Sequence, residues 1–221
     1  MRKLPIAPIS KAVVTSVANT ATERLAWIRP SYVVLLALVG AMGAPLAMPI
    51  LPPAAFQRIY GSLGGASNAA IASGSSGIMP QNLADRFGWD SLTQTVQRVY
   101  TALPPEERAQ ACVLTGNYGE ASALSLLAAP GSLPPIVSAH NNYHLWGPGA
   151  CSGRVIILVG YSEGFAQKDA SASYTNVALA ATVDCPYCAS YERNLRIYVL
   201  SGVKDPSFDL RNSWPSLKHF D

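Results

Sequence analysis

Three short segments of this chain combine residue types that could bind a ligand or take part in chemistry. The first reads GNYGE, from Gly116 to Glu120, and lies between an apolar run and a helical pattern. Glycines in such a turn allow positive φ, so that successive backbone N–H groups can point at a phosphate or a sugar hydroxyl. The segment lacks the lysine of a Walker motif and the three glycines of a dinucleotide-binding motif. A plain strand-to-helix turn, with Glu120 capping the helix, is the alternative to a ligand site.

The second segment, HNNYHLW, begins at His140 and holds two histidines and two aromatic residues. His140 and His144 are four apart, a spacing that would put both imidazoles on one face of a helix. The amides between them and the Trp-Gly-Pro after them indicate a loop, and no Glu adjoins His140 to complete a zinc-protease motif. We therefore expect hydrogen-bonded structural histidines and no metal site. Alternatively, Asn142, Tyr143 and Trp146 could form a saccharide-binding surface, with apolar ring faces beside amide donors.

The third segment, Cys185-Pro-Tyr-Cys188, has the letters of a glutaredoxin-type active site. In that fold the cysteine pair opens a helix directly after the first strand of a small domain, where the helix N-terminus lowers the pKa of the thiol. Here the pair follows a late strand pattern. A structural disulfide or two free thiols is therefore preferred to redox catalysis. The remaining cysteines, Cys112 and Cys151, make a total too small for a disulfide scaffold, and the four do not form two metal half-sites.

Apolar periodicity predicts the elements that carry these segments. Residues 91–103 show the spacing of one helical face, with Ser91 and Gln94 placed as a capping box, and residues 121–129 and 214–220 read as further helices. Strands are predicted for the nearly continuous apolar runs at 111–115, 135–139, 154–160, 176–183 and 195–200. Runs of this kind are typical of strands covered on both faces. The predicted fold class is α/β, with a three-layer α/β sandwich around a mostly parallel sheet.

Ligands of open α/β sheets favour the crevice beyond the carboxyl ends of the strands. The GNYGE turn, the histidine segment and the pair Asp184 and Cys185 each follow a predicted strand. If those strands are parallel neighbours, their polar groups converge. The candidate binding residues are Asn117, Tyr118, Glu120, His140, Asn142 and Trp146.

A long uncharged stretch occupies the N-terminal part of the chain. No charged residue occurs from 30 to 57, and residues 31–51 supply the roughly 20 consecutive apolar residues that cross a bilayer. A buried core helix or a cleaved signal would be the alternatives, but a signal peptide normally begins within the first few residues. Basic residues lie mainly before the stretch, which predicts a cytoplasmic N-terminus and a domain on the outer side.

The chain of 221 residues therefore divides into four predicted parts. These are a cytoplasmic segment (1–29), a transmembrane helix (30–57), an interfacial segment with a Gly/Ser-rich linker (58–78) and an extracytoplasmic α/β domain (79–221). The hydrophobic fraction of 49% is enough for one good core. The formal charge of +3 comes largely from the N-terminal segment, and no Lys/Arg run interleaved with aromatic residues follows it. This pattern excludes a nucleic-acid partner.

Two sequence blocks, TGNYGEA and HNNYHLWGPG, together with the order of the surrounding motifs, resemble the carboxyl-terminal end of bacterial membrane glycosyltransferases of family 39, the protein O-mannosyltransferase-like group. The resemblance covers residues 31–221, and it implies the last spanning helix followed by an extracytoplasmic domain. Members of that family are polytopic proteins. They transfer a sugar from a polyprenyl-phosphate donor to an acceptor on the outer side of the bacterial inner (plasma) membrane.

In that family the acidic catalytic residues lie in the first extracytoplasmic loop, beside a metal-assisted donor phosphate. This chain matches no such loop, so the resemblance transfers no catalytic residue and implies no cofactor bound by the chain itself. We expect the carboxyl-terminal part of such an enzyme, inactive alone. Its expected partners are the lipid bilayer, the transmembrane catalytic part and a glycan or acceptor. The alternatives are a membrane-anchored glycan- or acceptor-binding module and a CxxC thiol oxidoreductase.

Overall fold

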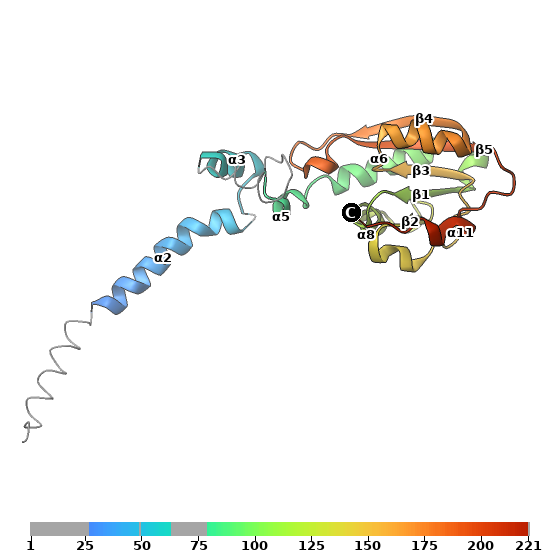
Figure 1. Cartoon of the computed structure of the whole chain (residues 1–221). Coiled ribbons are helices and arrows are strands. Elements are labelled where there is room, and N and C mark those ends of the chain that lie inside the picture. Colours follow the sequence, from blue (N-terminus) through green and yellow to red (C-terminus); the bar gives the residue numbers. More distant parts are fainter. Residues whose placement is uncertain (1–26, 49, 63–78, 221) are drawn as a thin grey trace, which may run out of the picture. The chain divides into compact units, whose positions relative to one another are not determined.

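The computed structural model describes residues 27–48, 50–62 and 79–220 (Figure 1). The chain forms two compact units, which divide after Tyr60. The first unit contains an apolar helix, α2 (Ile28–Ala47), and most of a shorter helix, α3 (Pro53–Ser62). The second unit contains the α/β domain.

Helix α2 is long and apolar enough to cross a membrane, and in the described part of the chain it is the one helix that meets this test. The window Ile28–Pro45 has a mean hydropathy of 1.4, and none of it is buried. The helix ends at Ala47, within the predicted span, and Met48 is already extended. Pro45 lies in the last turn of α2, and a proline there removes a helical donor, which favours an early end. The separate helix α3 covers the end of the predicted transmembrane helix (30–57) and the start of the predicted interfacial segment (58–78).

The second unit alternates helices with the strands of a single sheet. Helices α5 (Gln81–Ala84), α6 (Trp89–Ala102) and α7 (Pro105–Arg108) precede the sheet. The strands are β1 (Ala111–Thr115), β2 (Ile136–Ser138), β3 (Val155–Val159), β4 (Tyr174–Val183) and β5 (Leu195–Val203). Between and after them lie α8 (Tyr118–Leu127), η1 (Asn141–Trp146), α9 (Glu163–Phe165), η2 (Ala166–Ala170), α10 (Ser171–Ser173), η3 (Ser190–Glu192), α11 (Leu210–Ser213) and η4 (Trp214–Ser216).

The strand order in the sheet is β2-β1-β3-β5-β4. Strand β1 is parallel to β2 and β3, whereas β5 is antiparallel to both of its neighbours, β3 and β4. The sheet is therefore mixed, with β5 as the reversed strand. Because β4 and β5 follow one another directly, they pair antiparallel without a crossover helix. The carboxyl ends of β1, β2, β3 and β4 consequently meet one edge of the sheet, which we call the carboxyl edge.

Alternate side chains of the central strands enter two separate cores. Cys112 and Leu114 of β1 belong to one cluster, and Val113 of the same strand belongs to the other, as the period of two in a strand requires. The cluster that contains Val113 is completed by α6 and α8, through Leu92, Val96 and Leu124. The opposite cluster is completed by η2, the start of β4, α11 and η4, through Ala166, Ala170, Tyr174, Leu210 and Trp214.

The predicted cap of α6 is wrong. The helix begins at Trp89 with Gly88 as its N-cap, and no side chain caps it, so Ser91 and Gln94 lie inside the helix. Gly88 has φ +88, and a Cβ added there would lie 2.6 Å from Cys188 Sγ. Trp89 is anchored by a hydrogen bond of 2.7 Å from Nε1 to the Asp85 carbonyl. These tertiary contacts decide where the helix starts, and sequence spacing cannot show them.

Two further expectations differ from the structure. Strand β4 is not covered on both faces. It is the outermost strand next to β5, and most of its residues are exposed (Figure 1). The predicted closing helix at 214–220 is instead the short α11 followed by the single turn η4. Trp214 is nevertheless buried, at 5% exposed, whereas Leu217 and Phe220 are exposed. The β4 segment is rich in alanine and other small apolar residues, and such a run has the same appearance in sequence whether the strand is buried or exposed. The apolar run therefore predicted the strand correctly but not its exposure.

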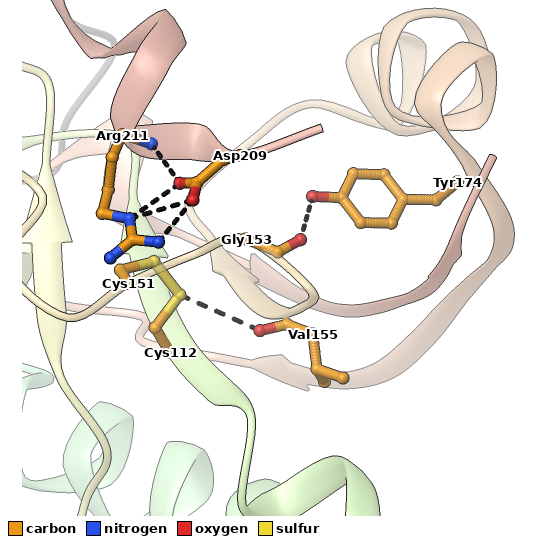
Figure 2. The surroundings of a disulfide bond; sticks show 7 residues. All are labelled: Cys112, Cys151, Gly153, Val155, Tyr174, Asp209 and Arg211. Atoms are coloured by element: carbon orange, nitrogen blue, oxygen red, sulfur yellow. Dashed lines mark hydrogen bonds and ion pairs between the residues drawn. A yellow bond between two sulfur atoms is a disulfide. The ribbon is translucent and has the colours of Figure 1, made fainter. Parts of the chain in front are cut away.

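A disulfide that the sequence did not predict joins Cys112 of β1 to Cys151, in the loop before β3 (Figure 2). The two Cα atoms are 5.5 Å apart, and the residues are 39 apart in sequence. Both cysteines are 1% exposed. In the same region the Tyr174 hydroxyl donates a hydrogen bond of 2.7 Å to the Gly153 carbonyl. The bridge and this hydrogen bond together hold the loop against the sheet.

Replacing Cys112 and Cys151 together by alanine should lower the free energy of unfolding by about 4 kcal/mol, because the bridge closes a long loop in the unfolded chain. Denaturant titration of the full-length protein in detergent measures this loss. The matched control replaces Cys185 and Cys188, whose bridge spans a sequence separation of 3. We expect a smaller loss, about 2 kcal/mol, from that shorter loop. If the two double variants lose the same free energy of unfolding, the loop-closure argument is contradicted.

Candidate binding site at the carboxyl edge

The GNYGE turn joins β1 to α8 through a complete capping box. Asn117 is the N-cap, and its Oδ1 accepts a hydrogen bond of 2.9 Å from the Glu120 N–H. The Glu120 carboxyl in return accepts hydrogen bonds from the N–H groups of Gly116 at 3.0 Å and Asn117 at 3.3 Å. These contacts satisfy donors that the first turn of a helix leaves without partners. The prediction that Glu120 caps the helix is confirmed.

Glu120 is 1% exposed and lies against the end of β3. A Cβ added to Gly160 would lie 2.1 Å from Oε1 of Glu120, which shows how closely the carboxyl approaches that glycine. Burial raises the pKa of Glu120 to about 8, against the two backbone hydrogen bonds that lower it, and the charge of Glu192 raises it further. At neutral pH the group is therefore mostly protonated. Burial also raises the pKa of the nearby Tyr161 to about 12, with a further contribution from the charge of Glu120.

Three aromatic rings stack behind this turn. The ring centroids of Tyr118 and His140 are 5.2 Å apart, and those of His140 and His219 are also 5.2 Å apart. The Tyr118 N–H donates to His140 Nδ1 at 3.2 Å, and the Asn141 side-chain amide lies 2.8 Å from Nε2. His140 is 4% exposed. The His140 ring is therefore a buried structural group of the carboxyl edge, and it has no open face for a metal or a ligand.

The carboxyl-terminal segment completes the edge, which no sequence pattern predicts. His140 and His219 form a parallel β-bridge, and the ring Nε2 of His219 lies 3.1 Å from the Gly116 carbonyl. The Asn141 N–H donates to the His219 carbonyl at 2.9 Å. His219 thus ties β1, β2 and the chain end together. Gly160 is the other residue that the sequence analysis did not single out, and a glycine at the end of the predicted strand 154–160 was the available signal.

His144 also has a structural role, as the sequence predicted. Its ring is stacked on Trp214 at 5.2 Å with an interplanar angle of 4°, and its Nε2 lies 2.8 Å from the Trp214 carbonyl. The Trp214 indole N–H donates back to the His144 carbonyl at 3.0 Å. His140 and His144 therefore face different partners. In the part of the chain that the structure describes, no group of three or more His, Cys, Asp or Glu side chains could hold a metal ion.

The exposed part of this edge is aromatic. Trp146 is 75% exposed and Tyr118 is 53% exposed, and Asn142 lies on the surface of η1 between them in sequence. The Tyr143 and Trp146 ring centroids are 4.4 Å apart, and the Tyr143 hydroxyl lies 3.3 Å from Ser125 Oγ of α8. Because Tyr118 begins the same helix, both sequence blocks border α8. We call Tyr118, Asn142, Tyr143 and Trp146 the aromatic surface.

The cysteine pair does not join this surface. Strand β4 ends at the same edge, but β3 and β5 separate it from β1, so Asp184 and Cys185 do not converge with the GNYGE turn. Cys185 and Cys188 form a disulfide and are 7% and 3% exposed. Their sulfurs pack against Gly88, where an added Cβ would meet Cys188 Sγ at 2.6 Å. This bridge fixes the entry to α6, and its burial lends no support to thiol exchange with a substrate.

A second buried carboxyl lies beside that bridge. Glu192 is 5% exposed, and burial raises its pKa to about 7, with a contribution from the charge of Asp85. Asp85 accepts a hydrogen bond of 3.1 Å from the Tyr191 hydroxyl, which in turn accepts one of 3.1 Å from Gln81. This cluster links α5 to η3.

Of the six candidate binding residues, three therefore make structural contacts and three are exposed. Asn117, Glu120 and His140 are engaged in the cap and in the ring stack, whereas Tyr118, Asn142 and Trp146 are exposed. The arrangement offers ring faces and an amide, which suits a polyol such as a sugar. No family model, no curated protein and no solved structure matches this chain.

Proposed function

We propose that this chain is the extracytoplasmic, carboxyl-terminal part of a membrane glycosyltransferase of the family-39 type, and that it binds a glycan or acceptor while the sugar transfer takes place elsewhere. One observation carries the proposal. The two sequence blocks on which the resemblance depends meet at α8, where the Tyr143 hydroxyl lies 3.3 Å from Ser125 Oγ, and each block contributes an exposed aromatic side chain, Tyr118 or Trp146. Their buried residues hold the surface in place, and their exposed residues are those that can stack on a sugar.

Membrane attachment is supported by α2, whose candidate span Ile28–Pro45 contains no buried residue. A helix of this length and composition is stable in a bilayer because its backbone polar groups are satisfied internally. The outer location of the domain is supported by two disulfides, since such bridges persist in oxidising compartments. The excess of basic residues before the span supports the same orientation.

We also propose that the α/β domain is a three-layer sandwich. Helices α6 and α8 complete one core, and η2 with α11 and η4 complete the other, so both faces of the central strands are covered. The second covering layer consists of short elements. A sheet covered in this way presents its loops at the carboxyl edge, where ligands of α/β proteins bind.

Trp146→Ala should weaken the binding of neutral oligosaccharides. A stacked aromatic ring contributes about 1 kcal/mol or more to such contacts, and weak carbohydrate binding has little affinity to spare. The measurement is calorimetric titration of the full-length protein in lipid nanodiscs against a set of neutral oligosaccharides. We expect saturable binding by wild-type protein and an affinity at least about five-fold lower in the variant.

The matched control is Leu145→Ala. Leu145 lies on the same short helix and is 71% exposed, close to the 75% of Trp146, but it has no ring. Its loss should leave the affinity within about two-fold of wild type. Flat isotherms for wild-type protein, or equal affinities for wild type and Trp146→Ala, would overturn the glycan-binding role.

The enzyme context has a separate test in the neighbouring DNA. We expect an upstream reading frame that encodes many spanning helices and an acidic first extracytoplasmic loop, and we expect its product to co-purify with this chain. If the upstream reading frame is unrelated and no membrane protein co-purifies, the glycosyltransferase context is contradicted. The chain would then be a membrane-anchored binding module.

A further inference from the structure

An apolar cavity lies on the face of the sheet opposite α6 and α8. Its volume is about 480 Å³, within the range of roughly 300 to 1,000 Å³ that is usual for small-molecule sites. Its floor is formed by Leu114, Ile156, Leu158 and Leu200, which come from β1, β3 and β5. Each of these side chains is 8% exposed or less. The floor is therefore deep and consists of aliphatic groups only.

Two walls of different origin enclose this floor. Phe165, Ala170 and Tyr174 form one wall, from the segment that connects β3 to β4. Phe208, Leu210 and other residues of the carboxyl-terminal segment form the other. Cavities lined by aliphatic and aromatic side chains exclude water and accept hydrocarbons. The lining thus selects an apolar guest.

The polar groups around the cavity disfavour an anionic guest. The Tyr174 hydroxyl donates to the Gly153 carbonyl at 2.7 Å, and the two ring nitrogens of His219 each lie 3.1 Å from a carbonyl oxygen. Among the described residues that line the cavity there is no lysine or arginine, and Asp169 is acidic. A phosphate or carboxylate head group would therefore meet no lysine or arginine of the described lining and would be repelled by Asp169. Ser173 and Ser213 match a hydroxyl head group instead.

We propose that this cavity binds the hydrocarbon chain of an uncharged amphiphile, a long-chain alcohol being the simplest example. The source is the bilayer, and from the proposed function the inference takes only the membrane attachment through α2. The chain lies over the floor, and the hydroxyl lies near Ser173, Ser213 and Asp169. The aromatic surface takes no part in this contact.

Photo-crosslinking tests the proposal with the full-length protein in lipid nanodiscs. The probe is dodecanol with a diazirine in the middle of its chain, and labelled peptides are located by mass spectrometry. We expect labelling of floor and wall segments, and also of α2, which reports partition of the probe into the bilayer. Ala170→Leu and Ser213→Leu each put a larger side chain into the cavity, from opposite walls. Labelling of the cavity should fall about ten-fold in either variant, because the new side chain takes the place of probe methylenes.

Three controls make the outcome decisive. Ala102→Leu enlarges an exposed side chain at a different groove, beside β4, and should leave labelling of the cavity unchanged. Labelling of α2 should be the same in all variants. Thermal melts of the filled variants should show melting temperatures equal to or about 3 °C above wild type, because filling a cavity stabilises a fold.

The proposal is overturned if both filled variants retain wild-type labelling of the cavity, or if α2 is labelled and the cavity is not. The same probe as its carboxylate, dodecanoate, should label the cavity several-fold less. Equal labelling by the two probes overturns the uncharged head group. In Trp146→Ala the probe should label the cavity as strongly as in wild type, because Trp146 does not line the cavity. Failure of this inference can therefore be distinguished from failure of glycan binding.

Discussion

Gly160→Ala should lower the free energy of unfolding of the α/β domain by about 4 kcal/mol, the sum of a backbone and a packing penalty. Gly160 has φ +79, a conformation that a residue with a Cβ adopts only with strain. The added Cβ would also lie 2.1 Å and 2.5 Å from the two carboxyl oxygens of Glu120. That carboxyl is held by the N–H groups of Gly116 and Asn117, so it cannot move aside without breaking the cap of α8. Denaturant titration of the full-length protein in detergent measures the loss.

Gly164→Ala is the matched control. Gly164 has no positive φ, and the nearest atom to an added Cβ is Ser162 Oγ at 3.9 Å, so the change should stay within about 1 kcal/mol of wild type. A second variant separates the two penalties. Adding Glu120→Ala to Gly160→Ala removes the clash, so the double variant should lose less than the sum of the single losses. Additive losses, or a Gly160→Ala variant as stable as Gly164→Ala, would show that the carboxyl does not press on this glycine.

The stability of the domain should fall as the pH rises from about 4.5 to about 8, and Glu120 should be the main cause. Its pKa is raised from 4.5 to about 8 by burial, so in this range the unfolded chain releases a proton that the folded protein retains. The contribution is fully present below pH 4.5 and is lost as the pH passes through the folded value. Each pH unit in between costs about 1.4 kcal/mol, which gives a total on the order of 5 kcal/mol. Unfolding free energies measured across this range test the slope.

Glu120→Gln should remove most of this pH dependence. Glutamine keeps an oxygen that can accept from Gly116 and Asn117, but it carries no titrating proton. The variant should be close to wild type at pH 5 and more stable than wild type at pH 8. Glu192→Gln is the necessary comparison, because burial also raises the pKa of Glu192 to about 7 and adds a smaller loss of the same sign. If Glu120→Gln and wild type keep a constant difference in stability from pH 5 to 8, the buried carboxyl does not titrate as described.

Local sequence patterns were sufficient to locate most elements of the α/β domain. Strand β1 occupies 111–115 as predicted, and β3 and β5 begin within a residue of their predicted starts. The capping box of Asn117 and Glu120 is also a local feature, since its two partners are three residues apart. Such features depend on backbone propensity and on contacts between near neighbours in sequence, and the order of residue types records both.

Long-range features were not accessible in this way. The reversal of β5, the edge position of β4 and the bridge between Cys112 and Cys151 each depend on segments far apart in the chain. The same holds for His219, which is stacked on His140 from 79 residues further along the sequence and has no local signal. Periodicity shows that a strand has a buried face, but it does not show which strand lies beside it.

The amino-acid sequence by itself determined an apolar helix long enough to span a membrane, an α/β domain after it and two polar blocks that follow strands. The tertiary structure alone decided which residues of those blocks are exposed. Glu120 and His140 are polar, and their types suggest contact with a ligand, yet they are buried because β3 and the carboxyl-terminal segment close over them. Trp146 is apolar, and its type suggests burial, yet it is exposed, and the tryptophan that is buried against His144 is Trp214, from a distant part of the chain. The exposure of a side chain depends on all the segments that pack around it. A sequence pattern reports only on residues that are close together in the chain.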